Sequence, residues 1–266
     1  MKKMNFIKMV ASGNDFVIIE KIHQSPVFSL QLLARKICDR KYGIGADGFL
    51  VLEKSKIADI SMRIFNPDGS EAQMCGNGAR CIALWVKLKN LKIKTRAGII
   101  DSEVNGDNAK IKLTNPKDIK LDIPIKINNR ALKVNYINTG VPHAVIFVER
   151  LDKIDVSGIG GQIRYHKRFA PYGTNVDFVE VLDNKSIKIR TYERGVEDET
   201  LACGTGVVAS ALITSHKLKT TSQKKMYVHT KSGEILKVYF DKLDNKLKDV
   251  WLEGRARMVY EGEYYV

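Results

Sequence analysis

The sequence contains two closely similar stretches, Met74-Cys75-Gly76-Asn77-Gly78-Ala79-Arg80 and, far downstream, Ala202-Cys203-Gly204-Thr205-Gly206-Val207-Val208. Each reads Cys-Gly-polar-Gly and then continues into small and apolar residues, a composition typical of a buried helix. A cysteine directly before a helix lies where the helix N-terminus lowers the pKa of a thiol and where backbone N–H groups can hold an anion. The two stretches therefore predict a matched pair of thiol acid/base groups, one in each half of the chain.

The similarity between the two halves extends upstream from the cysteines. Arg63 lies 12 residues before Cys75, and Arg190 lies 13 residues before Cys203. Further upstream, Gly13-Asn14-Asp15-Phe16 and Gly140-Val141-Pro142-His143 precede the two cysteines by 62 and 63 residues. A repeat that keeps its spacing over this length predicts two halves of similar architecture that face each other across a cleft.

The hydrophobic pattern of each half predicts strands first and a helix after the cysteine. Strands are expected at 16–20, 60–65, 145–148 and 176–181. The helices, expected at 79–88 and 207–215, carry small and aliphatic residues all round, which favours burial inside a curved sheet. A hairpin turn is expected at Asn105-Gly106-Asp107-Asn108, with a counterpart at 241–245.

The domain boundary is expected in the polar segment 114–122, which contains Pro116. The predicted first half spans residues 1–118 and is completed by a C-terminal strand within 256–266, and the second half spans 119–255. The length of 266 residues and the hydrophobic content of 44% suit two domains with cores of their own.

Composition narrows the classes of function. No apolar leader follows Met1 and no apolar run approaches the length of a membrane span, so a soluble cytoplasmic protein is expected. Four cysteines are too few for a disulfide scaffold, and none forms a Cys-x-x-Cys pair, so no metal site is expected. The net charge of +14 comes from scattered lysines without interleaved aromatic residues, which favours a solvated surface over nucleic-acid binding.

Two opposed thiols suit one kind of chemistry. Inverting the α-carbon of an amino acid requires a base on one face and an acid on the other, and Cys75 and Cys203 can supply one each. The glycines after each cysteine let backbone N–H groups approach a carboxylate and stabilise the charge that develops when the α-proton leaves. A single Cys-Gly-x-Gly would more often be an ordinary turn with an inert cysteine, but its repetition favours catalysis. No cofactor motif is present, so no cofactor is expected.

These residues together carry a family resemblance. The stretches 13–16, 43–48, 65–70, 74–80, 142–143, 192–195 and 202–206 resemble diaminopimelate epimerases, in that family's order and across nearly the whole chain. The resemblance implies interconversion of LL- and meso-diaminopimelate without pyridoxal phosphate, in lysine and peptidoglycan precursor biosynthesis. It also implies an α/β (α+β) fold of two pseudo-symmetric half-domains, each a barrel-like sheet around a central helix, with the active site in the cleft between them.

The resemblance assigns site residues by motif. Cys75 and Cys203 correspond to the two acid/base thiols, and His143 and Glu193 to groups that support them. The residues expected to bind substrate are Asn14, Asn66, Gly76, Asn77, Asn175, Glu193, Arg194, Gly204 and Thr205. Taken singly, Arg194 is typical of a surface ion pair and His143 of a structural residue, and only the surrounding motifs favour a functional role. The chain departs from the family at Gly48, where glutamine is frequent, and at Val141, where asparagine is frequent.

Two alternatives remain open at this point. One is another two-thiol racemase or epimerase of the same architecture, acting on proline or hydroxyproline. The other is a thiol redox or binding protein in which Cys75 and Cys203 form a reversible disulfide. Cys38 and Cys81 lie outside the repeated motif and are expected to be packing residues. The small-molecule substrate is the partner that the sequence predicts, and it leaves the oligomeric state open, a homodimer included.

Overall fold

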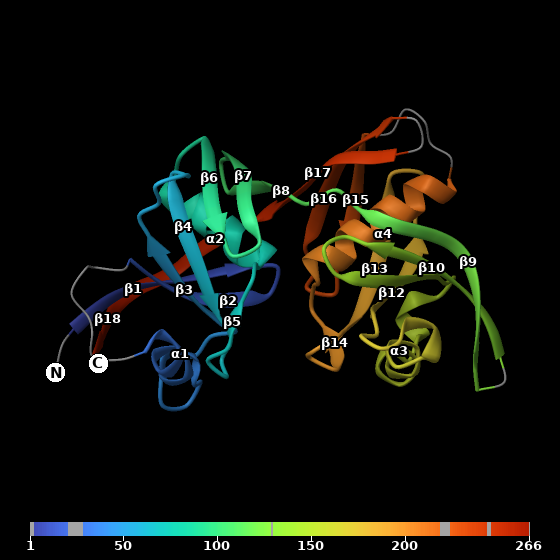
Figure 1. Cartoon of the computed structure of the whole chain (residues 1–266), viewed down its shortest axis with the longest axis horizontal. Helices are drawn as coiled ribbons and strands as arrows, with labels where there is room; N and C mark the ends of the chain where they lie inside the picture. Colours follow the sequence, from blue (N-terminus) through green and yellow to red (C-terminus); the bar gives the residue numbers. More distant parts are fainter. Residues whose placement is uncertain (1–2, 21–28, 129, 219–223, 244–245, 266) are drawn as a thin grey trace. The chain divides into compact units, whose positions relative to one another are not determined.

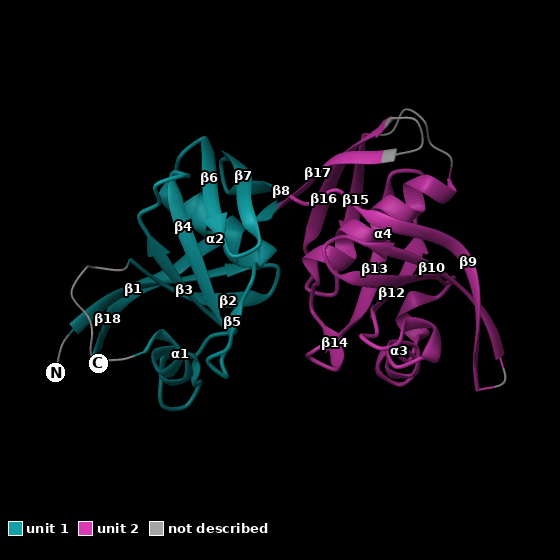
Figure 2. Cartoon of the chain, viewed as in Figure 1, with its two compact units in different colours: residues 1–111, 254–266 teal, residues 112–253 magenta. Residues whose placement is uncertain are grey.

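A computed structural model describes residues 3–20, 29–128, 130–218, 224–243 and 246–265 of the chain. It divides the protein into two compact units (Figure 2). Unit 1 contains residues 1–111 and 254–266, and unit 2 contains residues 112–253. Among the described residues, no helix is long and apolar enough to cross a membrane.

Unit 1 alternates strands with two helices (Figure 1). In chain order its elements are β1 (Lys3–Ala11), β2 (Asn14–Glu20), α1 (Leu30–Cys38), β3 (Gly48–Glu53), β4 (Ile60–Phe65), β5 (Glu71–Ala72), α2 (Gly76–Val86), β6 (Asn90–Thr95), β7 (Gly98–Asn105), β8 (Asn108–Lys112) and β18 (Arg257–Tyr265). The last strand returns from the far end of the sequence and pairs with β1 in antiparallel fashion.

Unit 2 follows the same plan. Its elements are β9 (Lys117–Ile127), β10 (Arg130–Asn138), β11 (Pro142–Phe147), the short 3-10 helix η1 (Leu151–Lys153), α3 (Val156–Arg164), a second 3-10 helix η2 (Lys167–Phe169), β12 (Asn175–Val181), β13 (Ser186–Glu193), β14 (Asp198–Thr200), α4 (Gly204–Lys217), β15 (Lys225–His229), β16 (Ile235–Leu243) and β17 (Lys246–Arg255). In this unit β9 pairs with β10, as β18 pairs with β1 in unit 1.

The strand pairing confirms the repeat that the sequence predicts. In unit 1, β2 pairs in parallel with β3 and β4 in parallel with β6. In unit 2, β11 pairs in parallel with β12 and β13 in parallel with β15. One helix lies in each of these crossovers: α1 and α3 in the first, α2 and α4 in the second.

The helices that follow the cysteines are largely buried inside their units. Every residue of α4 from Gly206 to Ser215 is buried, and so is every residue of α2 from Asn77 to Ala83. Helix α2 packs on β1, β4, β7 and β18, while α4 packs on β10, β11, β12, β13, β15 and β16. A helix that is apolar all round has to be enclosed in this way, because no face of it can be left to water.

Several predicted limits differ from the structure. The first boundary lies at 111/112 instead of 118/119, because residues from Lys117 onward form β9 and pair with β10 in unit 2. The second lies at 253/254 instead of 255/256. Both central helices begin directly after the cysteine, three residues earlier than predicted, and Leu88 lies outside α2 and is exposed.

The hairpin expected at 241–245 falls between β16 and β17, which pair in antiparallel fashion with Leu243 opposite Lys246. Residues 241–243 still belong to β16, and residues 244–245 lie outside the described part of the chain. The turn at 105–108 is confirmed, since Asn105 and Asn108 pair across it and Gly106 has a φ of 56°. The strand expected near the C-terminus is confirmed as β18.

Candidate active site

In unit 1 the first thiol occupies the N-terminus of the buried helix. Cys75 is the N-cap of α2, with extended backbone angles, and its Sγ accepts a hydrogen bond from the Gly78 backbone N–H at 3.4 Å. The side chain is partly exposed. A thiol in this position receives the partial positive charge of the helix terminus, which stabilises its thiolate form.

Two predicted substrate-binding residues of unit 1 contact each other. The Asn77 side-chain amide donates to Asn14 Oδ1 at 2.6 Å, and Asn77 Oδ1 accepts from Arg80 Nη2 at 2.5 Å. Arg80 is fully buried and also donates to Ser12 Oγ at 2.8 Å. This buried guanidinium therefore fixes the orientation of the Asn77 amide beside the start of α2.

A charged cluster supports Asn14 from the other side. Asn14 Nδ2 donates to Asp47 Oδ2 at 3.3 Å, and Arg40 binds both Asp47 and Asp15. Lys8, nearly buried, forms an ion pair with Asp15 at 2.7 Å. Although burial acts to raise it, the pKa of Asp15 is held far below its ordinary value by the hydrogen bonds from Arg40 and Lys8. The Asp15 carboxylate therefore stays ionised at neutral pH.

The other predicted binding residues of unit 1 stand apart from this network. Asn66 is exposed and shapes the turn after β4, where its side-chain amide donates to Ser70 Oγ at 2.9 Å. Gly76 is the first residue of α2, and a Cβ there would touch only Ile111, at 3.4 Å. At Gly48 a Cβ would come within 3.0 Å of the Phe16 ring, so the departure from glutamine lets this ring pack against β3.

In unit 2 the second thiol is buried. Cys203 is the N-cap of α4, and its Sγ lies 3.4 Å from Thr205 Oγ1. Burial raises the pKa of this thiol well above its ordinary value, and the negative charges of Glu193 and Asp177 raise it further. Hydrogen bonds from Thr205 and the Gly206 backbone act in the opposite direction. Removing a proton from Cys203 therefore requires a nearby group to accept it.

A continuous chain of hydrogen bonds leads from this thiol to a buried carboxylate. Thr205 Oγ1 lies 2.9 Å from His143 Nε2, and His143 Nδ1 lies 2.7 Å from Asp177 Oδ2. The second oxygen of Asp177 accepts from Thr191 Oγ1 at 2.8 Å. The side chains of His143 and Asp177 are completely buried. The imidazole is thus within reach of the Cys203 proton through a single hydroxyl group.

The neighbours of His143 determine its tautomer. Asn175 Oδ1 accepts from the Arg194 backbone N–H at 2.8 Å, which places the Asn175 amide nitrogen 3.4 Å from His143 Nε2. Because that nitrogen is a donor and Asp177 is an acceptor, the neutral imidazole carries its proton on Nδ1. His143 Nε2 is then an acceptor for the Thr205 hydroxyl, whose own oxygen can accept from the Cys203 S–H. The arrangement can pass a proton from the thiol to the imidazole.

A glycine makes room for the buried carboxylate. A Cβ on Gly206, in the first turn of α4, would lie 2.4 Å from Asp177 Oδ1 and 3.3 Å from Thr191 Oγ1. Only a residue without a side chain permits this approach of the helix to Asp177. The second glycine of the downstream motif is therefore explained by the partner of His143.

Four further residues singled out in the sequence belong to unit 2: Glu193 and Arg194 at the end of β13, Gly204 at the start of α4, and Val141 just before β11. The Glu193 side chain is partly buried, and burial raises its pKa. Its charge acts on both His143 and Cys203. Arg194 is partly exposed and donates to the Tyr172 carbonyl at 3.3 Å. Gly204 begins α4, and Val141 contributes only its backbone, by accepting from the Thr139 N–H at 3.1 Å.

The structure thus joins Asn14 with Asn77 in unit 1, and Cys203, Thr205, His143 and Asn175 in unit 2. Sequence reasoning overlooked Asp177, although an acidic residue inside the apolar run of β12 was a usable signal. Cys38 and Cys81 are buried, as expected of packing residues. Within the described parts of the chain, no three His, Cys, Asp or Glu side chains gather as metal ligands would.

Comparison with known proteins identifies relatives over the whole chain. The family model for diaminopimelate epimerase matches residues 6–118 and 135–259. A diaminopimelate epimerase of Caldanaerobacter subterraneus is 40% identical, covering 98% of this chain and 99% of its own length. That of Aquifex aeolicus is 39% identical, covering 97% of each chain. That of Methanocella arvoryzae is also 39% identical, covering 99% of this chain and 97% of its own.

Solved structures share the fold at lower identity. A Bacillus anthracis phenazine biosynthesis protein of the PhzF family superimposes with a TM-score of 0.74 at 21% identity, covering 100% of both chains. A hydroxyproline epimerase from Agrobacterium vitis superimposes with a TM-score of 0.69 at 15% identity, covering 99% of this chain and 91% of its own. The near-complete family match and the identity to full-length relatives lead to one conclusion: the chain belongs to the diaminopimelate epimerase family.

Proposed function

We propose that this protein interconverts LL- and meso-diaminopimelate without a cofactor, as a step of lysine and peptidoglycan precursor biosynthesis. One observation carries the proposal: the chain is about 40% identical to a diaminopimelate epimerase over 98% of its length. The Cys-Gly-x-Gly motif at the start of each buried central helix agrees with it.

Cys75 and Cys203 are the proposed acid and base. In each direction one thiolate removes the α-proton while the other thiol protonates the opposite face of the α-carbon, so no atom beyond the proton is exchanged. Backbone N–H groups at the starts of α2 and α4 stabilise the charge that collects on the substrate carboxylate. Both effects are larger in the transition state than in the bound substrate.

His143 and Glu193 support Cys203 in this scheme. The Nδ1–H tautomer of His143 can take the thiol proton through Thr205, and the Asp177 carboxylate then faces the resulting imidazolium. Glu193 acts on the same thiol through its charge. For the distal end of the substrate, Arg194 is the proposed carboxylate ligand, with Asn14, Asn66, Asn77 and Asn175 as the proposed amide ligands.

The direct test is incubation with LL-diaminopimelate in deuterated water. The expected result is the meso isomer with deuterium at the inverted α-carbon. Inversion of proline or hydroxyproline, with diaminopimelate left unchanged, would refute the proposal in favour of the other two-thiol class. The redox alternative would be favoured if Cys75 and Cys203 formed a reversible disulfide and the reduced protein showed no epimerisation.

Substitution of either cysteine tests the two-thiol scheme. Cys75→Ser and Cys203→Ser are each expected to lower kcat at least about 1,000-fold in both directions, because each direction requires both groups and a serine hydroxyl is a far weaker acid. Cys38→Ser provides the matched control, since this buried thiol lies outside both motifs. Full activity of either Cys75→Ser or Cys203→Ser would contradict the scheme.

We further propose that the enzyme acts in the cytoplasm, where thiols remain reduced, and that it functions as a homodimer. Light scattering on the purified protein, at concentrations used for the assay, tests the oligomeric state. A monomer with full activity would refute the dimer without affecting the proposed reaction.

A further inference from the structure

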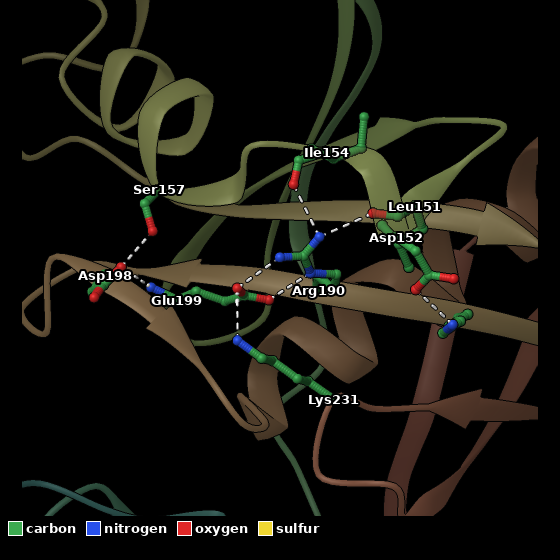
Figure 3. A network of polar contacts seen from close by, with 9 residues as sticks. Leu151, Asp152, Ile154, Ser157, Arg190, Asp198, Glu199 and Lys231 are labelled. Carbon is green, nitrogen blue, oxygen red and sulfur yellow. Dashed lines mark hydrogen bonds and ion pairs between the residues drawn. The ribbon is translucent and has the colours of Figure 1, made fainter.

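The segment that leads into each cysteine is held by a polar assembly that occurs twice in the molecule. In unit 2, Glu199 of β14 lies four residues before Cys203 and accepts from Arg190 of β13 with both oxygens, at 2.6 and 2.8 Å (Figure 3). Lys231 donates to the same carboxylate at 2.8 Å. The Glu199 side chain is only 9% exposed and that of Arg190 19%, so this pair is largely shielded from water, whereas Lys231 lies at the surface.

The arginine of this assembly is itself fixed. The remaining Nη1 of Arg190 donates to the carbonyls of Leu151 and Ile154, at 3.0 and 2.9 Å (Figure 3). The neighbouring Asp198 accepts from Ser157 at the start of α3, so β14 is anchored on both sides. Such a guanidinium cannot follow a moving carboxylate, and the short strand β14 is held in place.

Unit 1 contains the same ion pair at the equivalent position. Glu71 of β5 lies four residues before Cys75 and accepts from Arg63 of β4 with both oxygens, at 2.8 and 2.9 Å. Arg96 takes the place of Lys231, at 3.6 Å from Glu71 Oε2. The Arg63 hydrogen bond lowers the pKa of Glu71, so this carboxylate is charged at neutral pH.

A second attachment is also duplicated, and it lies nearer to the cysteines. The residue after Arg96, Ala97, donates its backbone N–H to the carbonyl of Gln73 at 3.2 Å. The residue after Lys231, Ser232, donates in the same way to Leu201 at 3.0 Å. Gln73 and Leu201 each stand two residues before the cysteine of their unit.

We propose that two ion pairs are positioning residues for the two thiols: Arg63–Glu71, together with Arg96, and Arg190–Glu199, together with Lys231. An ion pair with little exposure contributes little net stability, because desolvation offsets its attraction. A bidentate pair does fix geometry. Because the pair recurs four residues before both cysteines, we connect it with their common role as acid and base. The inference rests on the proposed function, in which a thiol displaced by about 1 Å loses roughly 100-fold in rate.

The experiment compares Glu71→Gln and Glu199→Gln with Glu71→Asp and Glu199→Asp, which keep the charge but are too short for both hydrogen bonds. Glu103→Gln and Asp241→Asn, which break exposed ion pairs of units 1 and 2, are the controls. Two quantities are measured: the alkylation rate of each cysteine by iodoacetamide, mapped by mass spectrometry, and kcat and KM with diaminopimelate in both directions.

Each Gln and Asp variant is expected to raise the alkylation rate of the cysteine in its own unit at least about threefold and to leave the other cysteine unchanged. It is also expected to lower kcat about 10- to 100-fold, with a smaller change in KM. Lower thermal stability with unchanged alkylation and kcat would overturn the inference, and so would an effect of Gln without one of Asp, which indicates charge alone. If each variant changes the alkylation rate of only the cysteine in its own unit, but the wild-type protein is inactive on diaminopimelate, the positioning role of the ion pairs would be supported and the proposed function refuted.

Discussion

At the scale of the residue, the hydrogen bonds of Asn175 and Asp177 decide how protons move around Cys203. The Asn175 carbonyl is committed to the Arg194 N–H, so its amide nitrogen faces His143 and only the Nδ1–H tautomer is compatible. Asp177 holds that proton and is in turn held by Thr191. The basicity available to the thiol therefore depends on a carboxylate that does not touch it.

Replacing this carboxylate tests its role. Asp177→Asn keeps the volume but places an amide opposite His143, removing the charge that stabilises an imidazolium. The kcat is expected to fall roughly 100- to 10,000-fold, as when the aspartate of a catalytic triad is replaced, with an altered pH dependence of kcat/KM and an unchanged circular dichroism spectrum. Thr191→Ser, which keeps the hydroxyl, is the control. A wild-type pH profile for Asp177→Asn would contradict the role.

The buried thiol also predicts how stability depends on pH. Burial raises the pKa of Cys203 above its value near 8.5 in the unfolded chain, so the folded state favours the protonated thiol. This stabilisation is complete below pH 8.5 and is lost as the pH rises above it, by about 1.4 kcal/mol per pH unit. Urea denaturation under reducing conditions measures the free energy of unfolding at pH 8 and pH 10. Its decrease between these two pH values should be smaller for Cys203→Ala than for the wild type.

A matching measurement on Cys38 provides the comparison. Burial raises the pKa of Cys38 to about 11, so Cys38→Ala should reduce the alkaline loss in the same direction. Equal losses of unfolding free energy in the wild type and both variants would contradict the assignment.

At the scale of the element, the two central helices differ in what their first turns contact. The third residue after each cysteine is a glycine, Gly78 in α2 and Gly206 in α4. A Cβ at Gly78 would meet the flexible end of Leu50 at 3.2 Å, whereas a Cβ at Gly206 would meet Asp177 at 2.4 Å. The same motif position therefore tolerates a side chain in one unit and excludes it in the other.

Alanine substitution separates the two cases. Gly206→Ala is expected to destabilise the protein by about 1–3 kcal/mol, because Asp177 and Thr191 are fixed by hydrogen bonds and cannot move away. Gly78→Ala should change the unfolding free energy by less than about 1 kcal/mol, because helix propensity offsets a contact that Leu50 can relieve. Urea denaturation measures both, and equal effects would contradict the steric argument.

At the scale of the whole molecule, the sequence was sufficient for the repeat but not for every element. The two cysteine motifs and the strand patterns before them predicted both central helices and the β-rich halves. Helix α3 was not predicted because it contains three glycines, which disfavour helices. One of them, Gly160, is required by packing, since a Cβ there would lie 2.6 Å from Tyr192, and such a contact is invisible in the sequence.

The misplaced boundary had a different cause. In β9, the buried residues Ile123, Ile125 and Ile127 alternate with exposed residues and belong to the core of unit 2. The charged residues of this segment made the strand pattern hard to recognise in the sequence. In the site, the motifs predicted Cys203, His143 and Thr205, but the contact between Asp177 and Gly206 joins segments distant in the chain. Local pattern carries no information on such tertiary partners.

Unit 1 depends on a strand from the far end of the sequence, and this is testable. Deleting residues 257–266 removes β18 and leaves one edge of β1 unpaired. Hydrogen exchange is expected to accelerate at least about tenfold for the amides of β1 and β2, and to remain unchanged for β12 and β13. Unchanged protection in β1 would show that β18 does not support unit 1.

Unit 1 is formed by two segments that are far apart in the sequence, and this has a consequence for folding during synthesis on the ribosome. Residues 112–253 form all of unit 2 and emerge before residues 254–266, which complete the sheet of unit 1. Because domains generally fold as units while the chain is being made, the half translated second acquires its full set of strands first. Until residues 254–266 emerge, unit 1, which carries Cys75, is an incomplete sheet in which one edge of β1 is unpaired. We expect chaperones to bind this nascent intermediate.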